Sequence, residues 1–257
     1  MGAIAGDMIG SVYEGQPIKS KAFPLFQAYS TFTDDTVLTV AVADAILGDG
    51  DYARALKRFG RAYPRAGYGG SFAAWLRTPD SRPYNSWGNG SAMRVSPVGW
   101  AFDSTETVLA EARASAEVTH NHPEGIRGAQ ATALAVFMAR TGASRAEIRR
   151  EVSARMGYDL SRTLDQIRPG YWFDVSCQGS VPESIIAFLE SEDFVDAIRN
   201  AISLGGDSDT MACIAGGIAE AFYGEVPPEI AEEVVTRMPA DLLEVAVAFR
   251  ARYKSKG

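Results

Sequence analysis

Apolar residues recur at intervals of three and four positions along most of this 257-residue chain, the spacing that places side chains on one face of an α-helix. Alternating apolar and polar residues, which form half-buried strands, are rare, and no parallel-sheet rhythm separates the helical segments. We therefore predict an all-α fold. The predicted helices cover residues 2–13, 36–47, 52–63, 105–117, 124–140, 144–155, 159–166, 182–190, 192–203, 210–222, 228–236 and 240–252.

Two stretches, 64–100 and 167–181, depart from this pattern. They are rich in Gly, Pro, Asn, Ser and aromatic residues, which is the composition of loops that carry binding sites. No shift in composition marks a domain boundary, and a chain of this length can bury one substantial core. The sequence predicts a compact single-domain multi-helix bundle over residues 1–257.

The overall charge restricts the partners that the protein can have. A net charge of −7 and an isoelectric point near 5.0 argue against general attraction to nucleic acid or to anionic membranes. Cys177 and Cys213 lack metal-binding spacing and are too few for a disulfide framework. The sequence shows neither a secretory leader nor an apolar run long enough to span a membrane. We expect a cytoplasmic protein.

Two short acidic clusters stand at the heads of apolar runs of helical length. They are Thr33-Asp34-Asp35-Thr36 and Asp207-Ser208-Asp209-Thr210. Such residues cap the free N–H groups of a first helical turn, which is one reading. Capping rarely needs so many acids, and desolvated carboxylates repel each other unless a cation lies between them. Because hard divalent cations take carboxylate and hydroxyl ligands, the pattern favours a metal site.

Small residues suggest how the two clusters meet. Gly2, Gly6 and Gly10 are spaced four apart, and Ala212 and Gly216 mark a similar face in the helix after the second cluster. Small faces allow two helices to approach closely. Such a contact in the middle of a bundle would bring the two acidic helix heads together.

Other catalytic motifs are missing from the sequence, including the nucleophile elbow, the phosphate-binding P-loop, the H-E-x-x-H zinc motif and the EF-hand. The only histidines, His120 and His122, precede Pro123, which is more typical of a loop entering a helix than of a catalytic pair. Two imidazoles without nearby cysteines do not form a structural zinc site. Glu14, read alone, is an ordinary solvated acid.

Five segments in order along the chain resemble the ADP-ribosylglycohydrolase family, which includes the dinitrogenase reductase-activating glycohydrolase and the ADP-ribosylhydrolases. The resemblance spans nearly the whole chain, and five motifs in sequence are highly specific. The segments are Gly2-Ala3-Ile4-Ala5-Gly6-Asp7 through Tyr13-Glu14-Gly15, Phe32-Thr33-Asp34-Asp35-Thr36, Gly88-Asn89-Gly90-Ser91-Ala92-Met93-Arg94, Thr119-His120 and Gly205-Gly206-Asp207-Ser208-Asp209-Thr210.

The resemblance implies a compact all-α bundle with two divalent cations, Mg²⁺ or Mn²⁺, at its centre. It implies that the metal ligands are Thr33, Asp34, Asp35, Asp207, Asp209 and Thr210. It implies that Glu14 orients the substrate near the metals, and we expect Glu14, or a metal-bound aspartate such as Asp34 or Asp35, to assist proton transfer.

The same resemblance implies a binding segment for the adenosine end and the pyrophosphate of the substrate. The residues implied are Asn85, Ser86, Trp87, Gly88, Asn89, Gly90 and His120. The glycine turn that contains Gly69 offers backbone N–H groups to a phosphate, although an ordinary surface loop is an equal alternative. No role follows for His122.

The implied activity is hydrolysis of the bond between C1 of the terminal ribose of ADP-ribose and an acceptor. The expected partners are an ADP-ribosylated protein, nucleic acid or small molecule as substrate and ADP-ribose as product, with no membrane partner and a monomer favoured. Two other readings stay open. One is a non-catalytic member that binds ADP-ribose or serves structurally, and the other is a metal-dependent phosphoesterase that would release AMP.

Overall fold

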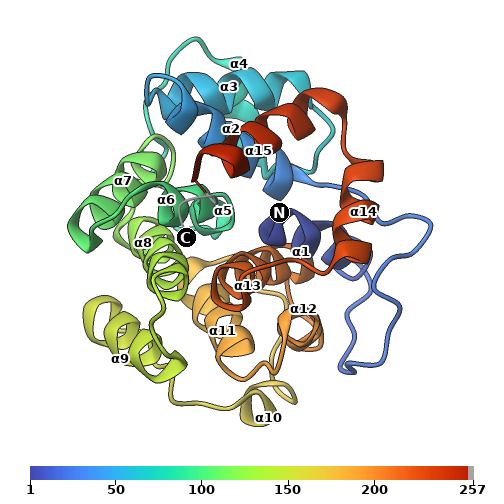
Figure 1. The fold of residues 1–257 in the computed structure, drawn as a ribbon. Helices are drawn as coiled ribbons and strands as arrows, with labels where there is room; N and C mark the ends of the chain where they lie inside the picture. Colours follow the sequence, from blue (N-terminus) through green and yellow to red (C-terminus); the bar gives the residue numbers. More distant parts are fainter. Residues whose placement is uncertain (254–257) are drawn as a thin grey trace.

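A computed structural model describes residues 1–253, which form fifteen helices and no strand beyond a single bridge between Gly88 and Ser176 (Figure 1). The predicted all-α bundle is confirmed. The helices are α1 (Gly2–Gly10), α2 (Asp34–Leu47), α3 (Tyr52–Ala62), α4 (Gly70–Arg77), α5 (Gly90–Met93), α6 (Ser96–Ala101), α7 (Thr105–Glu117), α8 (Pro123–Arg140), α9 (Arg145–Met156), α10 (Leu164–Ile167), α11 (Cys177–Leu189), α12 (Phe194–Ile202), α13 (Ser208–Tyr223), α14 (Pro228–Arg237) and α15 (Ala240–Tyr253).

The two helices α1 and α13 form the centre of the bundle (Figure 1). All nine residues of α1 are buried, and so is α13 from Ser208 to Ala221. Helices that are covered on every side belong to the interior of a protein. Buried apolar side chains from Ala3 to Leu242 form one continuous cluster around this pair. The last four residues of the predicted domain, 254–257, lie outside the described part of the chain.

Close contact between α1 and α13 depends on glycine. A β-carbon added to Gly6 would lie 2.0 Å from the carbonyl oxygen of Ala212, and one added to Gly10 would lie 2.5 Å from that of Ser208. At Gly2 the carbonyl oxygen of Gly216 would lie 2.3 Å away. These distances are far below van der Waals contact, so the predicted small-residue interface is confirmed. It places the start of α13 beside the end of α1.

We expect Gly6→Ala to destabilise the protein by about 3 kcal/mol, because the new methyl group meets backbone atoms that cannot turn aside. For a chain of this size, that corresponds to a fall in Tm of roughly 6–12 °C. Gly170→Ala is the matched control, since a β-carbon there meets nothing within 4 Å. Thermal unfolding followed by circular dichroism measures both. Equal Tm values for the two variants would contradict the close packing of α1 on α13.

Helix ends follow local rules in several places. The sequence Ser144-Arg145-Ala146-Glu147 predicts a capping box. The structure confirms it, because the Ser144 hydroxyl accepts from the Glu147 backbone N–H while the Glu147 carboxylate accepts from the Ser144 N–H. The pair Pro227-Pro228 predicts a helix start, and Pro228 opens α14. Helix α13 ends at Tyr223, one residue after the predicted end, where Gly224 with a φ of 89° terminates it.

The predicted irregular stretch 64–100 is only partly irregular. It contains α4, α5 and α6, of four to eight residues each. Helices this short are not stable alone, so their sequence pattern is weak and packing against the rest of the bundle stabilises them. The prediction of one loop there was wrong.

Three predicted helix boundaries were also wrong. The first helix ends at Gly10 rather than 13, which leaves Glu14 beyond it, and the helix predicted over 159–166 is the single turn α10. Helix α11 begins at Cys177, five residues before the predicted start, and includes Pro182. The Ser176 hydroxyl caps it by accepting from the Gly179 N–H at 3.0 Å, which stabilises the first turn ahead of the proline.

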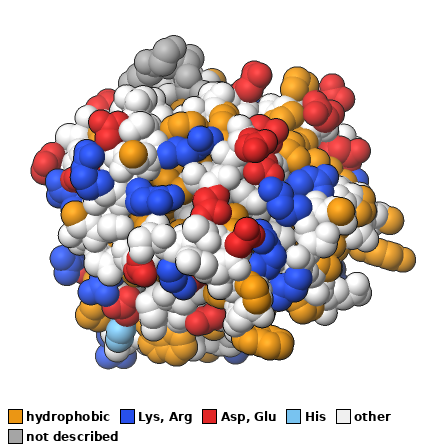
Figure 2. Space-filling model, turned by 90° about the horizontal axis from the view of Figure 1, so that it is seen from below, with side chains coloured by type: hydrophobic (Ala, Val, Ile, Leu, Met, Phe, Trp, Pro, Cys, Tyr) orange, Lys and Arg blue, Asp and Glu red, His pale blue; other side chains and the backbone are white. Residues whose placement is uncertain are grey.

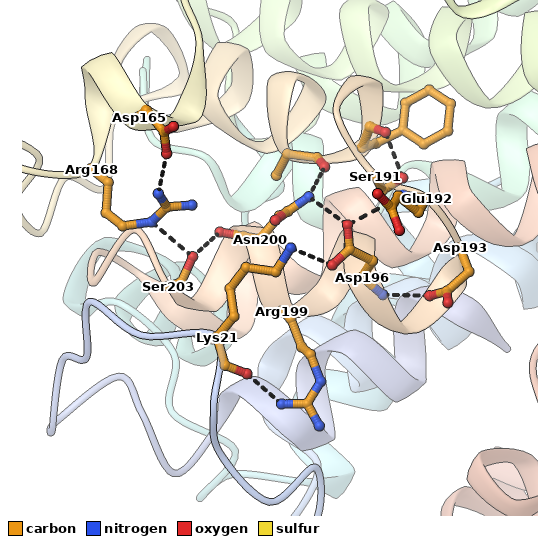
Figure 3. Close-up of polar contacts among 12 residues, drawn as sticks. Lys21, Asp165, Arg168, Ser191, Glu192, Asp193, Asp196, Arg199, Asn200 and Ser203 are labelled. Atoms are coloured by element: carbon orange, nitrogen blue, oxygen red, sulfur yellow. Dashed lines mark hydrogen bonds and ion pairs between the residues drawn. The ribbon is translucent and has the colours of Figure 1, made fainter.

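The segment 15–31, which leads from α1 to α2, is irregular but anchored. Lys21 forms an ion pair with Asp196 of α12, and Arg199 of the same helix donates a hydrogen bond of 2.5 Å to the Lys21 carbonyl oxygen (Figure 3). Asp196 also accepts from Asn200 at 3.3 Å (Figure 3). These contacts hold the segment against α12.

Charges of both signs are interspersed on the surface. The face in Figure 2 shows Lys, Arg, Asp and Glu side chains among apolar ones, without a broad area of one charge. On this face there is no extended basic area of the kind that attracts polyanions. Within residues 1–253, no helix combines the length and apolarity that a membrane span requires.

Candidate active site

A cavity of about 390 Å³ opens where the start of α2 faces the start of α13. Most residues predicted to form the site line this one cavity, although they come from segments up to about 200 positions apart. The predicted residues in its lining are Glu14, Thr33, Asp34, Asp35, Gly69, Ser86, Gly88, Asn89, Gly90, His120, Asp207, Asp209 and Thr210. Their roles in binding and catalysis stay predictions.

Asp7 joins α1 to the start of α2 beneath the cavity. Its carboxylate accepts hydrogen bonds from the Thr33 N–H at 2.9 Å, the Thr33 hydroxyl at 2.7 Å and the Thr36 N–H at 3.1 Å. The Thr36 hydroxyl adds a fourth at 2.5 Å. A carboxylate that accepts the free N–H groups of a first turn acts as a cap supplied by another helix. Asp7 therefore fixes where the acidic start of α2 lies.

The two acidic helix starts approach each other closely. The Thr210 hydroxyl lies 3.4 Å from an Asp35 carboxylate oxygen. Carboxylate oxygens of Asp7, Asp35 and Asp209 lie within 4.8 Å of one another, and the same is true of Glu14, Asp207 and Asp209. Asp209 belongs to both groups. Two neighbouring groups of oxygen ligands that share one carboxylate suit a pair of cations better than a single one.

Simple capping does not explain Asp207. It occupies the N-cap position of α13, yet its side chain makes no capping hydrogen bond. Instead its carboxylate accepts from the Asn89 side-chain amide at 2.7 Å, and that amide also donates to Ser180 at 3.2 Å. Asn89 therefore holds Asp207 turned toward the cavity.

Carboxylates in this cluster are crowded and shielded from water. Burial, reinforced by the charge of Asp209, raises the pKa of Asp7 to about 7 and that of Asp34 to about 8. The same causes raise the pKa of Asp35 well above its usual value. The pKa of Glu14 is also raised, by burial and then by Asp209. Without a cation, the ionised cluster opposes folding.

The donor set fits a hard divalent cation. Every polar group offered is a carboxylate or hydroxyl oxygen, which is what Mg²⁺ and Mn²⁺ prefer. The Oδ1 atom of Asp35 is buried and has no hydrogen-bond partner among the described residues, although buried acceptors are normally satisfied. A cation beside Asp35 would satisfy this atom and offset the repulsion. The residues present therefore fit a metal site.

Glycine residues form another part of the cavity lining. The turn Gly88-Asn89-Gly90 lies against His120, since a β-carbon on Gly90 would lie 3.2 Å from the His120 Nε2. Gly69 and Gly70 form the start of α4 and line the same cavity, so the free N–H groups of a helix start are available to an anion there.

Two predicted binding residues lie outside the cavity lining. Asn85 is exposed and adopts a left-handed φ of 55°, and its N–H donates to the Asn121 side chain at 2.8 Å. Trp87 is 48% exposed, and its carbonyl oxygen accepts from the Cys177 N–H at 3.0 Å. The structure does not bring these two side chains to the acids.

Sequence reasoning missed Asp7 and Arg94 as members of the site. Asp7 is the one charged residue in the otherwise apolar α1, and Arg94 interrupts the apolar run from Ala92 to Val95. Both are fully buried. An isolated charge within an apolar stretch was the available signal, because charged side chains are almost never fully buried without a specific partner.

Comparison with known proteins agrees with this fold and identifies the family. A profile of the ADP-ribosylglycohydrolase family matches residues 1–256. The chain belongs to the ADP-ribosylglycohydrolase family.

Individual proteins of known sequence or structure are also similar to this chain. The chain is 30% identical to the ADP-ribosylhydrolase ARH3 of Mus musculus, over 89% of this chain and 84% of that protein. It is 29% identical to the ADP-ribosylarginine hydrolase Tri1 of Pseudomonas putida (strain GB-1), over 91% and 72% of the two chains. A solved structure described as an ADP-ribosylglycohydrolase-related protein complex superposes with a TM-score of 0.74 at 25% identity, covering 96% of this chain and 94% of that one.

Proposed function

We propose that the protein is a hydrolase that removes ADP-ribose from an acceptor by cleaving the bond at C1 of the terminal ribose, and that it requires two divalent cations, Mg²⁺ or Mn²⁺. The arrangement of Asp209 between two carboxylate groups carries this proposal. The relatives named as ADP-ribosyl hydrolases support the reaction class. The physiological acceptor stays open, and ADP-ribosylated protein, nucleic acid and small molecules are all candidates.

Thr33, Asp34, Asp35, Asp207, Asp209 and Thr210 are the proposed ligands. When bound, the cations supply a Lewis acid that fixes the ribose hydroxyls and lowers the pKa of a nearby water. Asp7 is a further candidate in the site. It accepts a hydrogen bond from the Thr33 hydroxyl, and its carboxylate lies in one group with those of Asp35 and Asp209.

The chain's own acids have two tasks in this reaction. Positive charge develops at C1 as the glycosidic bond breaks, and surrounding carboxylates stabilise it. A proton must also move between the water and the leaving group. Glu14 is the proposed acid for this transfer, because it is the exposed member of its carboxylate group and its pKa is raised toward neutral pH. Asp34 and Asp35 are the alternatives.

The non-metal side of the cavity suits the remainder of ADP-ribose. The start of α4 at Gly69 offers N–H groups to the pyrophosphate. Ser86, the Gly88-Asn89-Gly90 turn and His120 are proposed to contact the adenosine end.

A substrate panel tests the proposal. ADP-ribosylated arginine, serine and nucleic-acid substrates are incubated with the protein in Mg²⁺, in Mn²⁺ and in EDTA, and the products are separated by chromatography. We expect free ADP-ribose from at least one substrate, with turnover lost in EDTA. Undiminished turnover in EDTA would rule out metal dependence. Release of AMP would favour a phosphoesterase, and binding of ADP-ribose without turnover would favour a non-catalytic member.

A further inference from the structure

Arg94 is a buried cation with no carboxylate partner within residues 1–253. It follows α5 and is fully inaccessible to solvent. Its Nη2 atom donates to the Ser115 carbonyl oxygen and to the Thr119 hydroxyl, each at 2.9 Å. Its Nε and Nη1 atoms have no partner among the described residues. Burying a guanidinium in this way is unfavourable, and the proposed function as stated does not use it.

The Thr119 hydroxyl connects Arg94 to His120. A hydroxyl has one hydrogen to donate, whereas a guanidinium can only donate. Thr119 Oγ1 must therefore accept from Arg94, and its hydrogen is left for another acceptor. His120 Nδ1 lies 2.8 Å from Oγ1. If Nδ1 accepts this hydrogen, the ring proton of the neutral imidazole resides on Nε2.

The surroundings of His120 keep its ring neutral, so only one of its two nitrogens carries a hydrogen. Burial and the nearby Arg94 charge hold the pKa of His120 well below its usual value, so the ring stays neutral. Tyr84 is the other titratable group facing it, with ring centroids 5.9 Å apart, and its phenol also forms a hydrogen bond with the Thr119 side chain. Burial raises the pKa of Tyr84 to about 12, so its phenol keeps its hydrogen near neutral pH.

The Nε2 atom of His120 faces the cavity. It has no hydrogen-bond partner in the described part of the chain, and His120 lines the cavity beside Gly88 and Gly90. A β-carbon on Gly90 would lie 3.2 Å from Nε2 and would cover it. The glycine turn thus leaves this nitrogen open to a ligand.

We propose that Arg94 is a positioning residue that, through the Thr119 hydroxyl, holds His120 with its proton on Nε2, and that this N–H donates a hydrogen bond to an acceptor atom of the bound ligand. The ligand part rests on the proposed function and takes ADP-ribose as the occupant. The tautomer part concerns the free protein alone.

The tautomer is tested by long-range ¹H–¹⁵N correlation spectra of the free protein. His122→Asn leaves His120 as the sole histidine, and asparagine keeps the N-cap of α8. In this background we expect a protonated Nε2 and an unprotonated Nδ1. Thr119→Val should give a mixture of both tautomers, and Thr119→Ser, which restores the hydroxyl, should return the single form. A proton on Nδ1 in the parent, or an unchanged spectrum in Thr119→Val, would overturn the proposal.

Two further variants separate the contributions of Arg94 and Tyr84. Arg94→Met removes the donor to Thr119 and should produce the same tautomer mixture. If that variant does not fold, Arg94→Gln, whose side chain is too short to reach Thr119, takes its place. A single Nε2–H form in the folded Arg94 variant would eliminate the role of Arg94. Tyr84→Phe should leave the tautomer unchanged, whereas a switch would show that Tyr84 directs the Thr119 hydroxyl instead.

Calorimetry with ADP-ribose tests the ligand part. His120→Leu removes the N–H donor and should weaken binding roughly five- to tenfold. An even tautomer mixture in Thr119→Val should cost only about twofold, because the Nε2–H form is still half populated. Equal affinities for His120→Leu and the parent would refute donation from Nε2. Failure of the parent itself to bind ADP-ribose would count against the proposed function, while the spectra would still decide the tautomer.

Discussion

Asp207→Asn is expected to lower the rate of ADP-ribosyl hydrolysis at least about 100-fold. Replacing groups that merely support metal ligands costs 10- to 100-fold, so replacing a ligand should cost at least as much. Asparagine keeps the shape of the side chain and one oxygen, but it removes the negative charge. Initial rates at saturating Mg²⁺ measure the effect on whichever substrate of the panel is turned over.

Asp51→Asn provides a matched control for this change. Asp51 is the N-cap of α3, where its side chain accepts from the Arg54 N–H, and asparagine caps a helix about as well as aspartate. We expect activity within about twofold of the parent protein. If Asp207→Asn behaved like Asp51→Asn, Asp207 would have no role in metal binding, and the proposed ligand set would be wrong.

Mg²⁺ is expected to raise the Tm of the parent protein by about 5–11 °C for each bound cation at roughly 100 times its Kd. Binding to the native state alone contributes about 2.7 kcal/mol at this concentration, and each kcal/mol corresponds to roughly 2–4 °C for a chain of this size. Differential scanning calorimetry in EDTA and over a Mg²⁺ series measures the shift. A Tm independent of Mg²⁺ and Mn²⁺ would leave the carboxylate cluster without its proposed cations.

In EDTA, Asp35→Asn is expected to have a higher Tm than the parent protein. The pKa of Asp7 and Asp34 is higher in the folded protein than the ordinary value of 3.8, so the native state binds protons more tightly than the unfolded chain. Metal-free stability therefore falls as the pH rises from about 4 to about 8. Removing the charge of Asp35 lessens this repulsion, so the variant in EDTA should melt higher than the parent at pH 8 and gain little from Mg²⁺. A lower Tm in EDTA, with the full gain from Mg²⁺, would contradict this account.

Some features of the fold can be predicted from short stretches of sequence, because interactions between residues close along the chain determine them. Helices α3 and α12 carry the three- and four-residue apolar spacing, and the Ser144 capping box marks the start of its own helix. The glycine spacing in α1 indicated close packing because only glycine permits backbone contact. The predicted grouping of the acids into one cavity depended on this contact and on the family resemblance.

Other features depend on contacts between distant segments. Helices α4 to α6 are too short to leave a periodic signal. Asp7 looked like a lone charge because its partners, Thr33 and Thr36, lie 26 and 29 positions away. The directions of Asn85 and Trp87 depend on contacts with Asn121 and Cys177. Contacts between residues so far apart along the chain cannot be inferred from a single sequence.

The four hydrogen bonds that Asp7 accepts have a consequence for metal selectivity. They join α1 to the start of α2, so the oxygen atoms cannot readily adjust to an ion of another size. A rigid cage discriminates by radius, whereas a pliant one accommodates both small and large ions. We therefore expect Ca²⁺ to compete poorly with Mg²⁺ and Mn²⁺ at this site. A substitution that loosens the packing of α1 on α13 should weaken this selectivity even when the protein still folds.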